Sequence, residues 1–416
     1  MTTVPATPNT VRALFSQRDY PYFWFARLVA NIGVMIQSVA LGWQVYNIAR
    51  QTHTVAESSL YVGLIGLVSF LPLLLFVLIA GETADRYERK RILLICLVIE
   101  IACAAVLTLA AFNRSSSIAL LLVVAFLFGC GRAFFAPANT ALGPMLVPRE
   151  LLPRAIAWNS LAWQFAAIAG PAFGGILVAW SPTAAYGTTT VLYAAALLSL
   201  ALISQSTTPA QKDGSRWQLM KEGLAYTWNN RIVFGAISLD LFAVLLGGVT
   251  ALLPVFARDV LFVGPEGFGV LRAAPAIGAA AVAIVLSARP IRARAGQFMF
   301  GGVAVYGLAT IVFGFSKLYW LSVAMLIVLG AADMLSVFVR QTLMQLVTPD
   351  PMRGRVAAVS FLFIGASNEL GEFESGVVAR FLGPVGAALF GGIGALIVTG
   401  AWWRLFPALR KADRLE

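Results

Sequence analysis

The chain has 416 residues, of which 59% are hydrophobic and 12% are charged, and its mean hydropathy is +0.83. An ordinary globular domain is roughly 45–50% apolar and about 25% charged, so these proportions exclude a water-soluble enzyme. The net charge of +11 would suggest nucleic-acid binding in a soluble protein, but Lys and Arg at the cytoplasmic ends of membrane helices explain it better here.

Twelve apolar stretches are long enough to cross a bilayer, since one helical span needs about 20 residues. The first six cover about 22–48, 59–83, 92–112, 117–145, 155–180 and 184–204, and the second six cover about 232–257, 267–288, 297–315, 318–345, 356–380 and 385–405. The longest polar interval separates the two sets. We therefore expect an all-α integral membrane protein with an N-terminal six-helix bundle at 1–205, a cytoplasmic linker at 206–231 and a C-terminal six-helix bundle at 232–416.

The distribution of Lys and Arg predicts the orientation. With both termini in the cytoplasm, most of these residues lie on the cytoplasmic side, as the positive-inside rule requires. The few that fall on the outer side of this layout are Arg50, Arg114, Arg258, Arg272, Lys317 and Arg380. The asymmetry supports an even number of spans in this register.

Two halves with equal helix counts are typical of secondary transporters that bind substrate near the bilayer midplane. The sequence contains no Gly-Lys dipeptide, so a phosphate-binding Gly-x-x-x-x-Gly-Lys loop is absent and ATP use is not expected. The single histidine, His53, lies in a predicted outer loop, which leaves no basis for a metal site or another cofactor. The alternative is an integral membrane protein without transport activity, such as a lipid-modifying enzyme or a receptor.

Ionisable residues at membrane depth are costly and usually mark ion or substrate paths, although pairing between helices is the structural alternative. This chain places several of them deep inside predicted spans: Glu100, Arg132, Asp240, Asp333, Arg340, Glu369, Glu372 and Glu374.

Four of these acids are candidates for proton coupling. Asp240 has no cation within one turn of its own helix, and such a buried carboxylate tends to hold a proton, so Asp240 is the first single-residue candidate for carrying a proton. Glu369 and Glu372 are three residues apart on one helical face, so repulsion favours a proton on one of them. Asp333 lies deep in the tenth span. Each acid could instead accept hydrogen bonds from a cation and never titrate.

A second group of polar residues forms the candidate substrate site. Arg132 is suited to clamp an anionic group because a guanidinium stays charged. Asp333 and Arg340 are two turns apart on one helix, which is too far for a direct ion pair, so each needs a partner elsewhere. For Arg340, a structural ion pair with another helix is the favoured alternative to substrate binding. The remaining candidates are Asn31, Gln37 and Glu374.

The loop between the second and third spans reads Gly81-Glu-Thr-Ala-Asp85-Arg86-Tyr-Glu88-Arg89-Lys-Arg. It resembles the signature loop of the major facilitator superfamily, Gly-x-x-x-Asp-Arg-x-x-Arg-Lys-Arg. The resemblance implies a cytoplasmic gate that latches the two halves together and opens as the carrier rocks. Glu88 stands where the family usually has a second glycine.

The fifth span contains Gly170-Pro171-Ala-Phe-Gly174-Gly175, and Ala166 stands four residues before Gly170. This segment is similar to the superfamily's antiporter motif, Gly-x-x-x-Gly-Pro-x-x-Gly-Gly. Glycines one turn apart allow tight helix packing, and proline bends a helix. The resemblance implies proton-driven export.

Residues 129–138 and 368–376 resemble a narrower branch of the superfamily that includes the enterobactin-exporter-like carriers, also called transmembrane secretion effectors. The lysophospholipid transporters are a more distant resemblance. These likenesses imply a monomeric carrier in a bacterial cytoplasmic membrane that exports a small amphipathic or anionic molecule, siderophore-like or drug-like, in exchange for protons. A lysophospholipid flippase of the same fold is the alternative.

Overall fold

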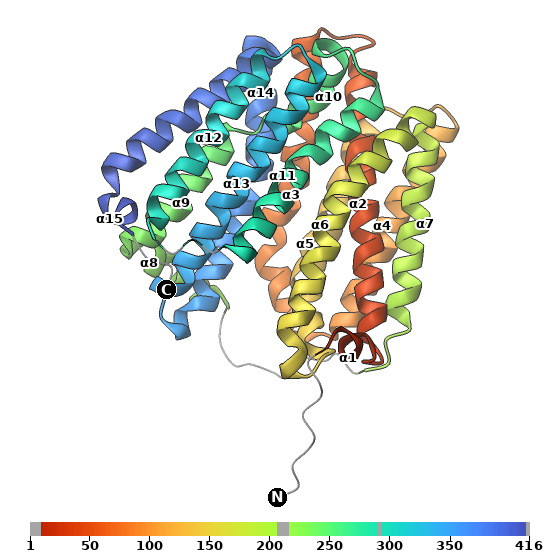
Figure 1. Cartoon of the computed structure of the whole chain (residues 1–416). Helices are drawn as coiled ribbons and strands as arrows, with labels where there is room; N and C mark the ends of the chain where they lie inside the picture. The colour runs from red at the N-terminus through yellow and green to blue at the C-terminus, as the bar shows by residue number, and fades with distance from the viewer. Residues whose placement is uncertain (1–9, 206–215, 290, 292, 413–416) are drawn as a thin grey trace, which may run out of the picture. The chain divides into compact units, whose positions relative to one another are not determined.

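The computed structural model describes residues 10–205, 216–289, 291 and 293–412, and these residues contain helices and turns but no strand (Figure 1). Part of the predicted linker, 206–215, lies outside the described residues. Arg292 and Pro290 of the short loop 289–294 also lie outside them. The remaining linker residues include a helix.

The helices follow the apolar stretches of the sequence closely. In chain order they are α1 (Val11–Phe15), α2 (Tyr20–Ala49), α3 (Val55–Arg86), α4 (Arg89–Phe112), α5 (Ile118–Leu142), α6 (Leu152–Trp180), α7 (Pro182–Ala201), α8 (Arg216–Asn229), α9 (Arg231–Leu246), α10 (Leu253–Val255), α11 (Pro265–Ala288), α12 (Ala295–Phe315), α13 (Tyr319–Val347), α14 (Asp350–Leu405) and α15 (Pro407–Arg410). Short helical turns flank α10 at Val249–Leu252 and Phe256–Val260.

Eleven helical segments among the described residues are long and apolar enough to cross a membrane. The longest, α14, contains a break at Gly383, whose φ of 73° and ψ of 170° are not helical. A residue with a side chain rarely adopts this positive φ, and the following Pro384 cannot continue the hydrogen-bond ladder. The break divides α14 into two spans, which confirms the predicted all-α, twelve-helix architecture.

The chain divides into two compact units. The first comprises Met1–Ala40, Leu71–Ser116 and Val123–Asp213, and the second comprises Leu41–Phe70, Ser117–Leu122 and Gly214–Glu416. The end of α2 and the beginning of α3 therefore belong with the C-terminal helices. Helix α3 continues from one unit into the other and carries Pro72 beside the boundary. The bundle boundaries at 205 and 232 stay a prediction from sequence order.

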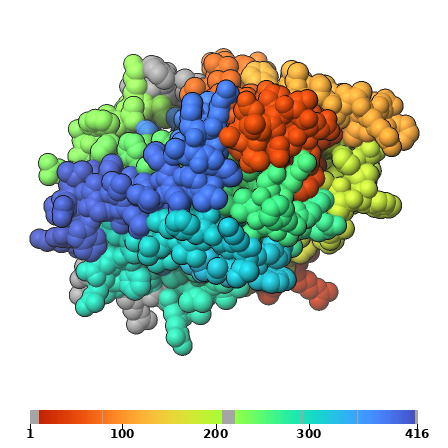
Figure 2. Space-filling view, turned by 90° about the horizontal axis from the view of Figure 1, so that it is seen from above, coloured from red at the N-terminus to blue at the C-terminus, as the bar shows by residue number. Residues whose placement is uncertain are grey.

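Each unit has its own core. In the first unit, α1, α2, α4 and α7 meet around fully buried side chains such as Tyr20, Leu93 and Tyr193. In the second unit, α11 and α12 both pack against α13, and α9 and α12 pack against α14. Figure 2 shows the blue surface of α14 beside the teal surface of α12. These packed helices hold the charged side chains described next.

Candidate functional site

A buried ion pair joins two helices of the second unit. Arg340 of α13 donates from its Nη1 to the carboxylate of Asp240 on α9, and these residues are only 2% and 6% exposed. Asp240 has no cation within one turn on its own helix, as the sequence indicates, but Arg340 reaches it from another helix. Arg340 has almost no exposed surface for a substrate, so the pair supports the structural role considered for this residue.

Asp333 lies beside this pair. Asp240, Asp333, Tyr306 and Ser336 line a cavity of about 10 Å³, which is about enough for one water molecule. Asp333 is half-buried, and in the part of the chain that the structure describes its carboxylate makes no hydrogen bond or ion pair. The cavity lining therefore contains two carboxyl groups, and only that of Asp240 is paired with a guanidinium.

The seventh predicted span is long and apolar enough to cross a membrane, but its helix is not continuous. Helix α9 ends at Leu246 and is followed by Gly247 and Gly248. A Cβ atom on Gly248 would lie 2.2 Å from the carbonyl oxygen of Gly371 on α14, so only glycine permits this approach. Two polar side chains bind the freed carbonyls: the Tyr306 hydroxyl donates to Gly247 O at 2.7 Å, and Arg272 Nη1 donates to Thr250 O at 2.9 Å.

Arg272 connects this break to the acids of α14. Its Nη2 lies 3.5 Å from Glu372 Oε1, and both side chains are about three-quarters buried. Glu369 lies one turn before Glu372, and both contact α3 at Gly66, where a Cβ atom would be 2.7 Å from Glu369 O. Glu372 therefore has a cationic partner within the second unit. Glu374 is half-buried and accepts a hydrogen bond of 3.4 Å from the Ser375 hydroxyl.

Within the second unit, polar contacts join the hairpin between α2 and α3 to the C-terminal helices. The sequence analysis did not predict these contacts. Asp259 accepts hydrogen bonds from the Tyr46 hydroxyl and from Arg50, whose Nη2 lies 3.1 Å from Asp259 Oδ1. This bond raises the pKa of Arg50 above its usual value. Arg258 donates to Asn47. The only sequence signal was that Arg50 and Arg258 are among the few cations on the predicted outer side.

Backbone contact reinforces the attachment of the hairpin. A Cβ atom on Gly63 of α3 would lie 2.8 Å from the Cα atom of Gly376 on α14. The two helix backbones therefore touch directly, in the manner of small residues at membrane helix interfaces.

The first unit contains a separate polar group. Glu100 of α4 is 2% exposed and its side chain lies close to Gly131 of α5, which precedes the exposed Arg132. The Tyr193 hydroxyl is buried without a hydrogen-bond partner among the described atoms. On α2, Asn31 is half-buried, and Gln37 is 3% exposed and its buried Oε1 has no partner in the described part. The structure thus keeps these residues in a different unit from Asp240 and Asp333.

The predicted charged loop is mostly helical, since α3 continues to Arg86 and α4 begins at Arg89, and its cations bind the ends of neighbouring helices. Arg89 Nη1 donates to Ala141 O at 3.0 Å near the end of α5, and Lys90 Nζ donates to Ala201 O at 2.9 Å at the end of α7. Cations favour the C-terminal ends of helices, where carbonyls lack intrahelical partners. Arg86 pairs with Glu82 at 2.6 Å on the surface. Gly81 is buried and Asp85 half-buried in the same segment.

The glycines of the fifth span produce close packing of α6 on α2. A Cβ atom on Gly170 would lie 2.4 Å from the Cβ atom of Met35, and one on Gly174 would lie 3.2 Å from the Cα atom of Ile36. Pro171 and Gly175 are buried beside them. Larger residues at these positions would force the two helices apart.

A family model described as transmembrane secretion effector matches residues 10–416. Relatives from Citrobacter koseri and Shigella boydii are both named enterobactin exporter EntS. The first is 26% identical over 406 residues, covering 95% of this chain and 94% of the relative. The second is 27% identical over 393 residues, covering 92% and 91%.

Solved structures share the fold at low sequence identity. The POT family transporter PepTSo has a TM-score of 0.74 at 14% identity and covers 95% of this chain and 99% of its own. A D-xylose-proton symporter has a TM-score of 0.70 at 11% identity, with coverage of 94% and 98%.

Proposed function

The chain belongs to the transmembrane secretion effector family of the major facilitator superfamily, whose members are transporters and not enzymes, and from that premise we propose that it exports a small anionic or amphipathic molecule in exchange for protons. The protein is a multi-pass membrane protein. We place it in a bacterial cytoplasmic membrane, as a monomer with both termini in the cytoplasm and no use of ATP.

The observation that carries the proton-coupling proposal is the unequal charge count around the small cavity of the second unit. Asp240 is neutralised by Arg340, whereas Asp333 has no partner among the described residues. A second carboxylate in such surroundings becomes neutral by binding a proton. Asp333 therefore replaces Asp240 as our first choice for the proton site, because Asp240 is paired with Arg340; the Glu369 and Glu372 pair is a second site, at which a proton would compete with Arg272.

The substrate class follows from the polar groups of the first unit and from the names of the relatives. Arg132 offers an exposed guanidinium that can bind a carboxylate or a similar anion. Gln37 and Asn31 supply hydrogen-bonding groups on α2, and the unpaired Oε1 of Gln37 is suited to a hydroxyl donor. Because the relatives are named enterobactin exporters, we propose a siderophore-like cargo.

Alternating access requires contacts that form in one state and break in the other. The bonds of Asp259 to Tyr46 and Arg50 are suited to such a role because they lie at the end of a hairpin and are only partly buried. On the predicted cytoplasmic side, the loop containing Asp85, Arg86 and Arg89 is the proposed counterpart.

Transport in inverted membrane vesicles tests the proposal. With an acidic interior, the wild-type protein should accumulate labelled enterobactin, and Asp333→Asn should abolish this pH-driven uptake while preserving binding of the ligand. Asp350→Asn is the matched control because Asp350 is an exposed acid that pairs with Arg353 on the surface. Wild-type uptake by Asp333→Asn would remove Asp333 from the mechanism, and failure of the wild type to transport any siderophore would refute the cargo class.

A further inference from the structure

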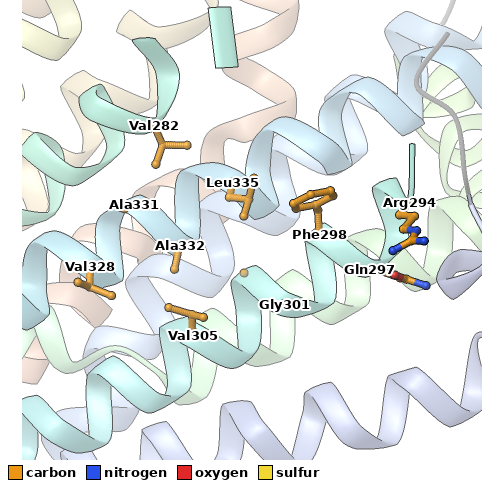
Figure 3. Close-up of a pocket in the computed structure, with 11 residues that line it drawn as sticks. Val282, Arg294, Gln297, Phe298, Gly301, Val305, Val328, Ala331, Ala332 and Leu335 are labelled. Atoms are coloured by element: carbon orange, nitrogen blue, oxygen red, sulfur yellow. The ribbon is translucent and has the colours of Figure 1, made fainter. Parts of the chain in front are cut away.

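An apolar crevice lies between α11, α12 and α13 in the second unit (Figure 3). Its volume is about 550 Å³, far larger than the cavity beside Asp333. Val282, Val305, Val328 and Leu335 are among its lining residues. The polar side chains of the lining, Arg294 and Gln297, lie close together at one end of α12 in Figure 3. The crevice thus has an apolar body and a basic end.

The crevice extends about as deep as one leaflet of a bilayer. Arg294 precedes α12 and Val305 lies inside it, eleven positions later. At about 1.5 Å per residue these positions are about 16 Å apart along the helix. Half of a hydrocarbon core that is about 30 Å thick is about 15 Å. An acyl chain whose headgroup lies at Arg294 would therefore end near Val305.

The wall of the crevice is open rather than sealed. Phe298, Val305 and Val328 are 46%, 43% and 37% exposed. A Cβ atom on Gly301 would meet no other atom within 4 Å, so this glycine keeps space free inside the crevice. Exposed apolar side chains on membrane-spanning helices are in contact with lipid. The bilayer around the protein can therefore provide the molecule that occupies the crevice.

The basic end selects the kind of lipid. Arg289 and Arg294 are both exposed at the ends of the helices that border the crevice. A guanidinium has five N–H donors, so Arg294 can bind a phosphate alongside its other contacts. Basic pockets between membrane helices on the cytoplasmic side bind anionic headgroups.

We propose that this crevice is a binding site for an anionic phospholipid, with one acyl chain between α12 and α13 and the phosphate at Arg294 and Gln297. Ala332 lines both the crevice and the cavity that holds Asp240 and Asp333. A resident lipid therefore supports the helices that carry the charged cluster. The lipid is a structural ligand in this proposal and not the cargo.

Native mass spectrometry of the full-length protein, titrated with phosphatidylglycerol or phosphatidylethanolamine of identical acyl chains, tests the site. The wild type should bind phosphatidylglycerol about fivefold more tightly, because one cation near a headgroup contributes about this much. Arg294→Gln should remove the preference while retaining binding. Gly301→Leu should lower the binding of both lipids because its side chain fills the crevice.

Gly400→Leu is the matched control, since a Cβ atom at Gly400 of α14 also meets no atom within 4 Å but lies outside the crevice. It should bind both lipids as the wild type does, and the melting temperature of each variant shows whether it is folded. Equal binding by folded Gly301→Leu and Gly400→Leu would overturn the proposal, as would an unchanged lipid preference in Arg294→Gln. Movement of phosphatidylglycerol between leaflets in proteoliposomes that depends on the carrier would also overturn it, since the lipid would then be cargo.

Discussion

The Asp240–Arg340 pair predicts an unequal effect of removing either partner. Removing one member of a buried ion pair costs about 3–5 kcal/mol because the other charge remains without compensation. In Asp240→Asn the remaining guanidinium cannot become neutral, since arginine keeps its proton in proteins. We therefore expect the free energy of unfolding to fall by up to about 3–5 kcal/mol. Ionisation of the neighbouring Asp333 offsets part of this loss at pH 7, so the destabilisation should not shrink toward pH 5.

Arg340→Met should behave differently because the remaining carboxylate can bind a proton. A free aspartate side chain has a pKa of about 3.9, so keeping such a group protonated costs about 4 kcal/mol at pH 7 and about 1.5 kcal/mol at pH 5. The destabilisation by Arg340→Met should thus shrink by up to about 1.4 kcal/mol for each pH unit that the solution is made more acidic. The double variant Asp240→Asn/Arg340→Met should recover most of the loss.

The measurement is the free energy of unfolding in mixed micelles, titrated with SDS at pH 5, 6 and 7 and compared with the wild type at each pH. Asp333→Asn is the control for the loss of a nearby carboxylate, because Asp333 has no hydrogen-bond or ion-pair partner among the described residues. This variant should change the free energy of unfolding by less than about 1 kcal/mol. Parallel pH profiles for the two single variants, or a loss below about 1 kcal/mol in Asp240→Asn, would refute the reasoning.

Three further expectations concern other contacts. Gly170→Ala should destabilise the protein by about 1–3 kcal/mol, measured in the same SDS titration, because its Cβ atom would overlap Met35; stability equal to that of Gly400→Ala would contradict the close packing. Glu372→Gln should reduce pH-driven transport severalfold in inverted vesicles, and unchanged transport would exclude this carboxyl as a proton site. Arg50→Gln should increase the rate of thiol labelling at a cysteine placed in the hairpin between α2 and α3. It should lower the free energy of unfolding by less than about 1 kcal/mol, because the ion pair with Asp259 is partly exposed. An unchanged labelling rate would show that this ion pair does not hold the hairpin in place.

Span positions and the twelve-helix fold could be predicted from the sequence because each span requires a long apolar run, and such runs are visible without tertiary information. Buried charges were also visible as exceptions within these runs. Their partners were not, because the pairing of Asp240 with Arg340 joins positions 100 residues apart. Helical spacing describes only neighbours on the same helix.

The break after α9 was missed for a similar reason. Gly247 and Gly248 stand within an apolar run that is compatible with one continuous helix, and glycine is tolerated in membrane helices. What ends the helix is the side-chain support from Tyr306 and Arg272, which binds the freed carbonyls. The attachment of the α2–α3 hairpin through Asp259 likewise depends on long-range contacts.

Helix α3 is a single rod whose two ends are embedded in different compact units. A rotation of either unit must then be absorbed along this rod or passed on through it. Pro72 lacks the N–H group that would tie its turn to the preceding one, so bending at that point costs less than elsewhere in the helix. Pro72 is thus the point at which α3 bends most easily. Replacing it with alanine should make the helix stiffer there and lower the transport rate, while the affinity for the substrate stays unchanged.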